Sequence, residues 1–210
     1  RYPRWCVDVP IPETGSGALR HAEILAGRAV ETATATPAGA VHLNWPLREP
    51  LAPTARSLSM ADAANKAAST TDARATRFSR ASLVADPRDV DELVALALCC
   101  ERGVVCCGPM DADARLASAL AAFSTHAGWP IFADPASQLR RGGWTRGTPI
   151  LDAGDLIARA PRFAAAHAPE VVIRIGDPPV SKAQRLWLEA SAPQTVWWLD
   201  EGGQWGEPSR

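Results

Sequence analysis

The apolar run Val171-Val172-Ile173-Arg174-Ile175-Gly176 decides the fold, together with the helix and the second apolar run that follow it. Residues 181–191 are expected to form a helix with one apolar face, made of Ala183, Leu186, Trp187 and Ala190. The run Val196-Trp197-Trp198-Leu199-Asp200 comes next and reads as another strand. Strand, amphipathic helix and strand in this order are typical of a parallel βαβ unit, whose strands have no face in water.

The same alternation extends upstream as far as residue 86. Strands are predicted at Val104-Val105-Cys106-Cys107 and Pro130-Ile131-Phe132-Ala133-Asp134. Helices are predicted over residues 86–102, after Asp111, and over residues 153–166. Their apolar faces are expected at Val90, Leu93, Val94, Ala97 and Leu98 in the first helix and at Leu116, Leu120 and Phe123 in the second. We therefore predict an α/β fold, a Rossmann-like parallel sheet with helices on both faces.

Residues 1–55 have a different organisation. A helix is predicted over residues 18–34, and the alternating run Val41-His42-Leu43-Asn44-Trp45 is typical of a half-buried strand. We interpret residues 1–55 as the C-terminal end of another α/β domain, and residues 56–85, rich in Ala, Ser and Thr, as a linker that contains a short helical stretch. Residues 86–210 are then the Rossmann-like domain, incomplete at its C-terminus. Neither end of the sequence looks like a natural terminus, so we expect an internal piece of a larger protein.

The composition excludes several classes of partner. Twenty-two Lys and Arg residues balance 23 Asp and Glu residues, for a net charge of -1, and no basic cluster suited to nucleic acid is visible. No apolar run approaches the roughly 20 residues that span a bilayer, and no secretory leader opens the sequence. The five cysteines include two adjacent pairs but no C-x-x-C, which favours small buried side chains in a reducing cytosol over a metal or redox site.

Ligands of open parallel sheets bind beyond the carboxyl ends of the strands. Gly108-Pro109-Met110-Asp111 has one glycine where a dinucleotide site has G-x-G-x-x-G, and Asp111 is expected to cap the following helix, so no dinucleotide is predicted. After the later strand, Ser181 is expected to cap a helix whose first turn contains Lys182. A cation is unfavourable at a helix N-terminus. Lys182 is therefore a candidate contact for an anionic ligand, with a solvated surface lysine as the alternative.

Two further groups of polar residues carry weaker signals. Arg140, Arg141 and Arg146 lie on a glycine-rich loop and are a candidate anion or effector patch, although loop arginines are usually solvated. The four histidines have no spacing typical of metal ligands, and His42 is expected to make a hydrogen bond in the core.

Several motifs, in order along the chain, resemble those of the 2-succinyl-5-enolpyruvyl-6-hydroxy-3-cyclohexene-1-carboxylate synthases, thiamine-diphosphate enzymes of menaquinone biosynthesis. The first is Val41-His42-Leu43-Asn44-Trp45-Pro46-Leu47-Arg48-Glu49-Pro50-Leu51. It is followed by Gly128-Trp129-Pro130-Ile131-Phe132-Ala133-Asp134-Pro135 with Ser137-Gln138-Leu139-Arg140, by Arg174-Ile175-Gly176-Asp177-Pro178-Pro179-Val180-Ser181-Lys182, and by Asp200-Glu201-Gly202-Gly203-Gln204-Trp205. The resemblance covers nearly the whole chain outside the linker.

This resemblance implies a function for the full-length protein. Members join 2-oxoglutarate, after its decarboxylation to a succinic semialdehyde carbanion, to isochorismate, with thiamine diphosphate and Mg²⁺ or Mn²⁺. The resemblance assigns residues 1–55 to the pyrimidine-binding domain and residues 86–210 to the central domain. It places Lys182, with Ser181 beside it, against a substrate carboxylate. Some members carry an arginine next to this lysine, where this chain has Ala183.

The resemblance also implies what this piece lacks. The glutamate that activates the cofactor and the motif that holds the diphosphate and metal are expected outside residues 1–210, so no catalytic, cofactor-binding or metal-binding residue is expected here. The parent is expected to be a cytoplasmic transferase and a homo-oligomer, a dimer or tetramer, without membrane segments. Two alternatives stay open: another thiamine-diphosphate enzyme such as an acetolactate-synthase-like protein, and a non-catalytic Rossmann-type module that binds an anion.

Overall fold

The computed structural model describes residues 2–13, 15–49, 51–70, 78–81 and 83–200. The chain divides into two compact units, residues 1–82 and 83–210. The described part of the chain contains no helix long and apolar enough to cross a membrane.

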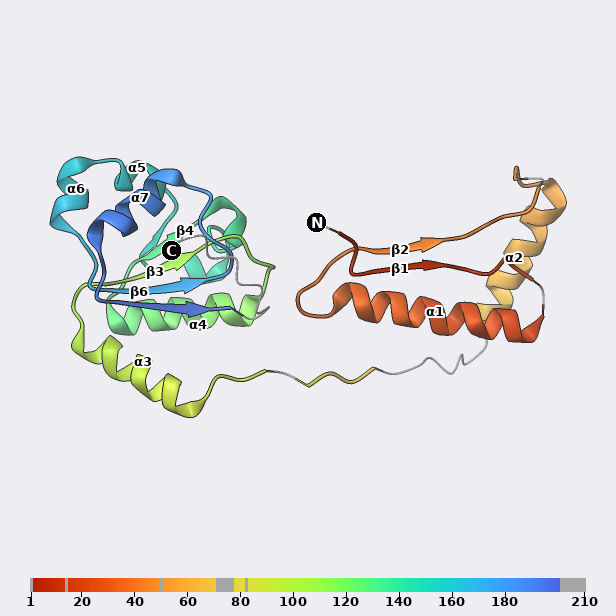
Figure 1. Cartoon of the computed structure of the whole chain (residues 1–210), viewed down its shortest axis with the longest axis horizontal. Coiled ribbons are helices and arrows are strands. Elements are labelled where there is room, and N and C mark those ends of the chain that lie inside the picture. The colour runs from red at the N-terminus through yellow and green to blue at the C-terminus, as the bar shows by residue number, and fades with distance from the viewer. Residues whose placement is uncertain (1, 14, 50, 71–77, 82, 201–210) are drawn as a thin grey trace. The chain divides into compact units, whose positions relative to one another are not determined.

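The first unit contains a parallel βαβ motif. Strands β1 (Trp5–Asp8) and β2 (Val41–Asn44) pair in parallel, with Cys6 opposite His42, and α1 (Ser16–Thr34) connects them. Figure 1 shows α1 running alongside the two strands. Leu25 of α1 is buried, whereas Val30 on the same helix is exposed. The strand β1 was not expected from the sequence, while α1 and β2 lie within two residues of their predicted bounds.

The stretch after β2 contains more helix than the sequence suggested. Helix α2 (Ala55–Thr70) occupies much of the segment interpreted as a linker. Further along, residues 78–81 pack on α1: the Arg80 guanidinium pairs with the Glu31 carboxylate and donates to the Thr34 carbonyl at 2.7 Å. The hydrogen bond from Arg80 lowers the pKa of Glu31.

The second unit is the predicted Rossmann-like sheet, and the fold class is confirmed. Its five parallel strands have the order β5-β4-β3-β6-β7. The strands are β3 (Gly103–Cys107), β4 (Ile131–Ala133), β5 (Ile150–Leu151), β6 (Val171–Ile175) and β7 (Thr195–Leu199). The two-residue β5 was not predicted, whereas β3, β4, β6 and β7 match the apolar runs.

Helices cover both faces of this sheet (Figure 1). On one face α3 (Pro87–Cys99) and α4 (Ala114–Ala127) pack over a core that includes Val105, Cys107 and Trp129. On the other, α5 (Gly154–Ala158), α6 (Pro161–Ala166) and α7 (Lys182–Ser191) pack over Cys106 and Phe132. Two short 3-10 turns, η1 (Pro135–Ser137) and η2 (Gly143–Thr145), lie between β4 and β5.

Several details of the helices correct the sequence-based expectations. The helix expected over residues 153–166 is two helices, because Pro161 has no N–H to continue the first and instead begins the second. The apolar face of α3 is narrower than expected, since Leu93 and Ala97 pack on the core while Val90, Val94 and Leu98 are exposed. In α7 the buried positions are Gln184 and Trp187, and Leu186 is half exposed.

Candidate functional site

Three loops meet at the carboxyl edge of the large sheet, after the adjacent strands β3, β4 and β6. The loops after β3 and β6 touch through their backbones: the Asp177 N–H donates to the Pro109 carbonyl at 3.0 Å. A Cβ atom on Gly108 would lie 1.7 Å from the Asp177 carbonyl oxygen, so only glycine fits there. Gly176 has a φ of 75°, a conformation that glycine adopts without strain. Gly108 and Gly176 therefore allow the backbones of the loops after β3 and β6 to lie in direct contact.

The third loop joins this assembly through a buried carboxyl group. Asp134 follows β4 and is 2% exposed. Its Oδ1 accepts the Ala136 N–H at 2.9 Å, and its Oδ2 accepts the Val180 N–H at 2.9 Å. The second bond connects the loop after β4 to the Pro-Pro loop after β6. From the sequence, Asp134 is predicted only to end a strand.

Ser181 caps α7 as predicted. Its Oγ accepts the Gln184 N–H at 3.1 Å and donates to the carboxylate of Asp155 in α5. Asp155 also pairs with Arg159 at 2.9 Å. No sequence signal marked Asp155, because its helix has only five residues and no clear periodicity. Ser181 is thus held on both sides, and the start of α7 is fixed relative to α5.

Lys182 is the first residue of α7, and its side chain is exposed. Within the described residues, no hydrogen bond or ion pair engages its ammonium group. The rigid cap and the absence of a local partner leave this cation available to an anionic ligand at the carboxyl edge of the sheet. Its role in binding substrate stays a prediction.

The three loop arginines have different surroundings. The Arg140 Nε donates to the Ala133 carbonyl at 2.9 Å, and the Arg141 guanidinium pairs with the Asp152 carboxylate at 3.2 Å. Arg146 is exposed and has no such partner among the described residues. Two of the three therefore serve the local structure, and an anion patch on this loop stays a hypothesis.

The loop after β3 is a tight turn rather than a phosphate cradle. The cap of α4 is Asp113, which accepts the Arg115 N–H at 2.8 Å, so the expectation that Asp111 caps this helix is wrong. The Met110 N–H already donates to the Ala136 carbonyl at 3.3 Å. The space beside Gly108 is filled by the Asp177 carbonyl.

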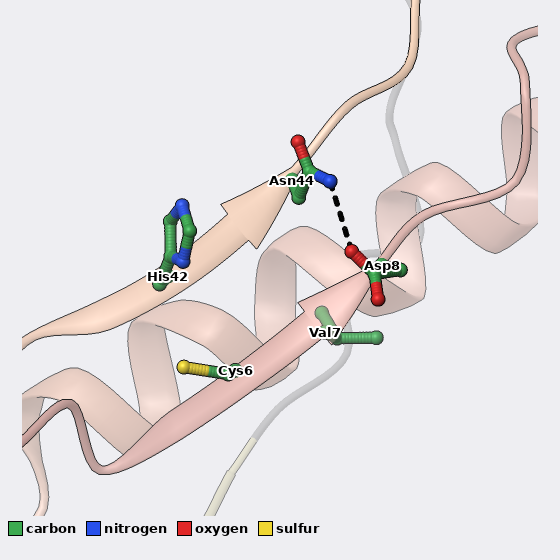
Figure 2. Close-up of a pocket in the computed structure, with 5 residues that line it drawn as sticks. All are labelled: Cys6, Val7, Asp8, His42 and Asn44. Carbon is green, nitrogen blue, oxygen red and sulfur yellow. Dashed lines mark hydrogen bonds between the residues drawn. The ribbon is translucent and has the colours of Figure 1, made fainter.

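A small hollow of about 160 Å³ lies on the open face of the two-stranded sheet in the first unit. Figure 2 shows the side chains of Cys6, Asp8, His42 and Asn44 along it, with the Asn44 amide donating to the Asp8 carboxylate at 2.9 Å. His42 is exposed, so the expectation that it makes a hydrogen bond in the core is wrong. The alternating strand places it on the face opposite the one that packs on α1.

The described residues do not fit a metal or a cofactor diphosphate. No group of three or more His, Cys, Asp or Glu residues among them is arranged to hold a metal ion. In Gly176-Asp177-Pro178, after β6, the Asp177 N–H already donates to the Pro109 carbonyl and is not available to a phosphate.

The cysteines divide by position rather than forming one cluster. All five are free thiols; Cys106 and Cys107 are buried on opposite faces of the sheet, whereas Cys6 and Cys99 are exposed. Burial raises the pKa of Cys106 to about 12 and raises that of Cys107 as well. The expectation of small buried side chains therefore fits the strand pair, holds in part for Cys100, which packs against the core, and is wrong for the exposed Cys99.

The parallel sheet, its helices on both faces and the loops at its carboxyl edge define a Rossmann-like α/β domain, as found in thiamine-diphosphate enzymes. Comparison with curated proteins narrows this class. The chain is 37% identical to the 2-succinyl-5-enolpyruvyl-6-hydroxy-3-cyclohexene-1-carboxylate synthase of Haloquadratum walsbyi, over 97% of the chain and 33% of that protein. The proteins of the same name from Geobacillus kaustophilus and Myxococcus xanthus are also 37% identical, over 100% and 96% of the chain.

These similarities confirm the resemblance drawn from the sequence motifs. The chain is homologous to one segment of these synthases, and it spans about a third of the length of the curated relatives it matches. No family model matches the chain.

Proposed function

We propose that this chain is part of a thiamine-diphosphate-dependent synthase of menaquinone biosynthesis, which joins the succinyl unit of 2-oxoglutarate, after loss of CO₂, to isochorismate. The observation that supports this most strongly is the 37% identity over nearly the whole chain to proteins named as that synthase. In this proposal residues 1–55 end the pyrimidine-binding domain, residues 56–85 are the connection, and residues 86–210 form most of the central domain. The parent is a cytoplasmic homo-oligomer.

In this proposal Lys182 binds a carboxylate of isochorismate. Its ammonium group stands at the start of α7, on a backbone held by the Ser181 cap and by Asp134. A charge-assisted hydrogen bond from a cation already in position contributes more than one that must first be ordered. Thiamine diphosphate and Mg²⁺ or Mn²⁺ supply the decarboxylation chemistry, and their binding residues belong to parts of the parent protein other than this segment.

The test uses the full-length parent protein with Lys182→Ala beside the wild type. Both are supplied with 2-oxoglutarate, isochorismate, thiamine diphosphate and Mg²⁺, and the consumption of isochorismate is followed. We expect turnover by the wild type, and a KM for isochorismate raised roughly 10- to 100-fold in the variant, because a charge-assisted hydrogen bond is lost. A small change in kcat would mark Lys182 as a contact made equally in the ground and transition states.

Arg185→Ala is the matched control, because it removes a positive charge from the exposed side of the same helix, one turn further on. Its KM is expected to stay within about twofold of the wild type. Condensation of pyruvate in place of isochorismate consumption would move the parent to the acetolactate-synthase-like enzymes. Anion binding without any cofactor-dependent reaction would instead support a non-catalytic module.

A further inference from the structure

The carboxyl group of Asp134 connects two loops that are 46 residues apart in the sequence. One of its oxygens closes the local turn η1 through the Ala136 N–H, and the other accepts the Val180 N–H, both at 2.9 Å. The side chain is almost fully buried, so water does not compete for these bonds. A buried carboxyl group costs free energy unless its oxygens find donors, and here both have one.

The loop that receives this bond has few other means of attachment. Pro178 and Pro179 have no N–H to donate, and the Asp177 N–H is used by the Pro109 carbonyl. Val180 therefore carries the first backbone N–H after the two prolines, directly before the cap residue Ser181. The Val180 side chain is 70% exposed and adds no packing of its own. The bond to Asp134 thus restrains the backbone between the two prolines and Ser181, which is itself held by its cap bond and by Asp155.

We propose that Asp134 is a positioning residue for Lys182. By holding the Val180 N–H it fixes the backbone two residues before Lys182, so that the lysine side chain extends from a fixed position before substrate arrives. This inference rests on the proposed function, since it gives the position of Lys182 a purpose in binding isochorismate. Ordering the loop in the free protein removes part of the entropy cost of binding.

Asp134→Asn in the full-length parent tests this. The amide keeps one acceptor oxygen, for which the Ala136 and Val180 N–H groups then compete, and Asp134→Ala, made beside it, removes both bonds. We expect the Val180 amide to exchange with solvent at least about tenfold faster, and KM for isochorismate to rise about tenfold while kcat changes by less than about twofold. In the Lys182→Ala background the same substitution should change KM by less than about twofold, because the positioned group is absent.

Asp86→Asn is the control, because Asp86 caps α3 through one backbone bond at 2.9 Å and makes no contact with the Pro-Pro loop. It should leave KM and Val180 exchange unchanged. If Asp134→Asn does not fold, Val180→Pro removes the donor of the same bond without altering the buried carboxyl group, and the same KM effect is expected.

Two results would overturn the inference: unchanged exchange at Val180 in Asp134→Ala, which has neither acceptor oxygen, or an equal rise in KM with and without Lys182. The second result would give Asp134 a general structural role. Absence of isochorismate consumption by the wild type would overturn the proposed function and the substrate named here. The exchange measurement would then still decide whether Asp134 holds the loop.

Discussion

Single residues at the carboxyl edge of the sheet are determined by space and hydrogen bonding more than by hydrophobicity. Two loop backbones lie in contact because of Gly108 and Gly176, and Asp134 binds a third loop to them. These contacts join residues far apart in the sequence, so no local sequence pattern predicts them. Lys182 could be singled out from the sequence because a cation in the first turn of a helix breaks a local rule. Asp134 could not, because an Asp-Pro after a strand is also typical of an ordinary turn.

The close approach at Gly108 gives a first prediction at this scale. In Gly108→Ala the added Cβ would lie 1.7 Å from the Asp177 carbonyl oxygen. The crowding atoms of Asp177 and Pro178 belong to the backbone, so no side-chain rotation can move them away. We expect the free energy of unfolding to fall by about 1–3 kcal/mol, as for other overpacked sites. Gly143→Ala is the control, since nothing lies within 4 Å of its added Cβ. Urea denaturation of both variants checks this, and equal stabilities would contradict it.

The buried thiols give a second prediction, on pH dependence. Burial raises the pKa of Cys106 from 9.0 to about 12 in the folded protein, and that of Cys107 rises too. Above pH 9 the unfolded chain releases these protons while the folded chain retains them, so stability is full below pH 9 and falls above it. The free energy of unfolding should decrease by roughly 1 kcal/mol for each thiol by pH 10.

Urea denaturation between pH 8 and 10 measures this decrease, with Cys106→Ala as the comparison. The variant is less stable at every pH but should lose less stability across this range. A pH dependence identical to that of the wild type would show that Cys106 does not contribute.

At the scale of elements, the sequence predicted those strands and helices whose pattern is long enough to read. The strands β3, β4, β6 and β7 are continuous apolar runs, because both of their faces are covered. In contrast, β1 has only four residues and begins just after Pro3, and β5 has only two residues. Neither is long enough for an alternating pattern of apolar and polar residues to be recognised. Helix α2 was underestimated because its alanine-rich sequence favours helix by intrinsic propensity without an apolar stripe.

The C-terminus of α7 gives a prediction at this scale. Ala192 ends this helix in the left-handed conformation, with φ 44° and ψ 60°, where its Cβ is unfavourable. The side chain is exposed, so its removal leaves no cavity. Ala192→Gly should raise the free energy of unfolding by about 0.5–1 kcal/mol, since glycine adopts this conformation freely but gains some entropy in the unfolded chain. Denaturant unfolding measures the change, with Ala192→Val expected to destabilise; a loss of stability with glycine would refute the prediction.

At the scale of the whole molecule, the two units differ in how much core they contain. Of the buried apolar side chains among the described residues, only Val9 and Leu25 belong to the first unit, and all the others belong to the second. The β1-β2 pair has α1 on one face and the polar side chains of Figure 2 on the other, whereas parallel strands are usually covered on both faces. This contrast fits a first unit that is part of a larger domain in proteins of the relatives' length.

The last prediction concerns the 210-residue chain without the rest of its parent. Among the described residues no three His, Cys, Asp or Glu side chains are arranged to hold a metal ion, and backbone atoms occupy the space beside Gly108 and Gly176. The curated relatives are about three times as long as the matched segment. We therefore expect the isolated chain to show no turnover and no measurable heat of binding when titrated with thiamine diphosphate and Mg²⁺, while the full-length parent binds both. Saturable binding by the isolated chain would mean that residues 1–210 contain a cofactor site. It would contradict the proposal that the cofactor-binding residues belong to other parts of the parent protein.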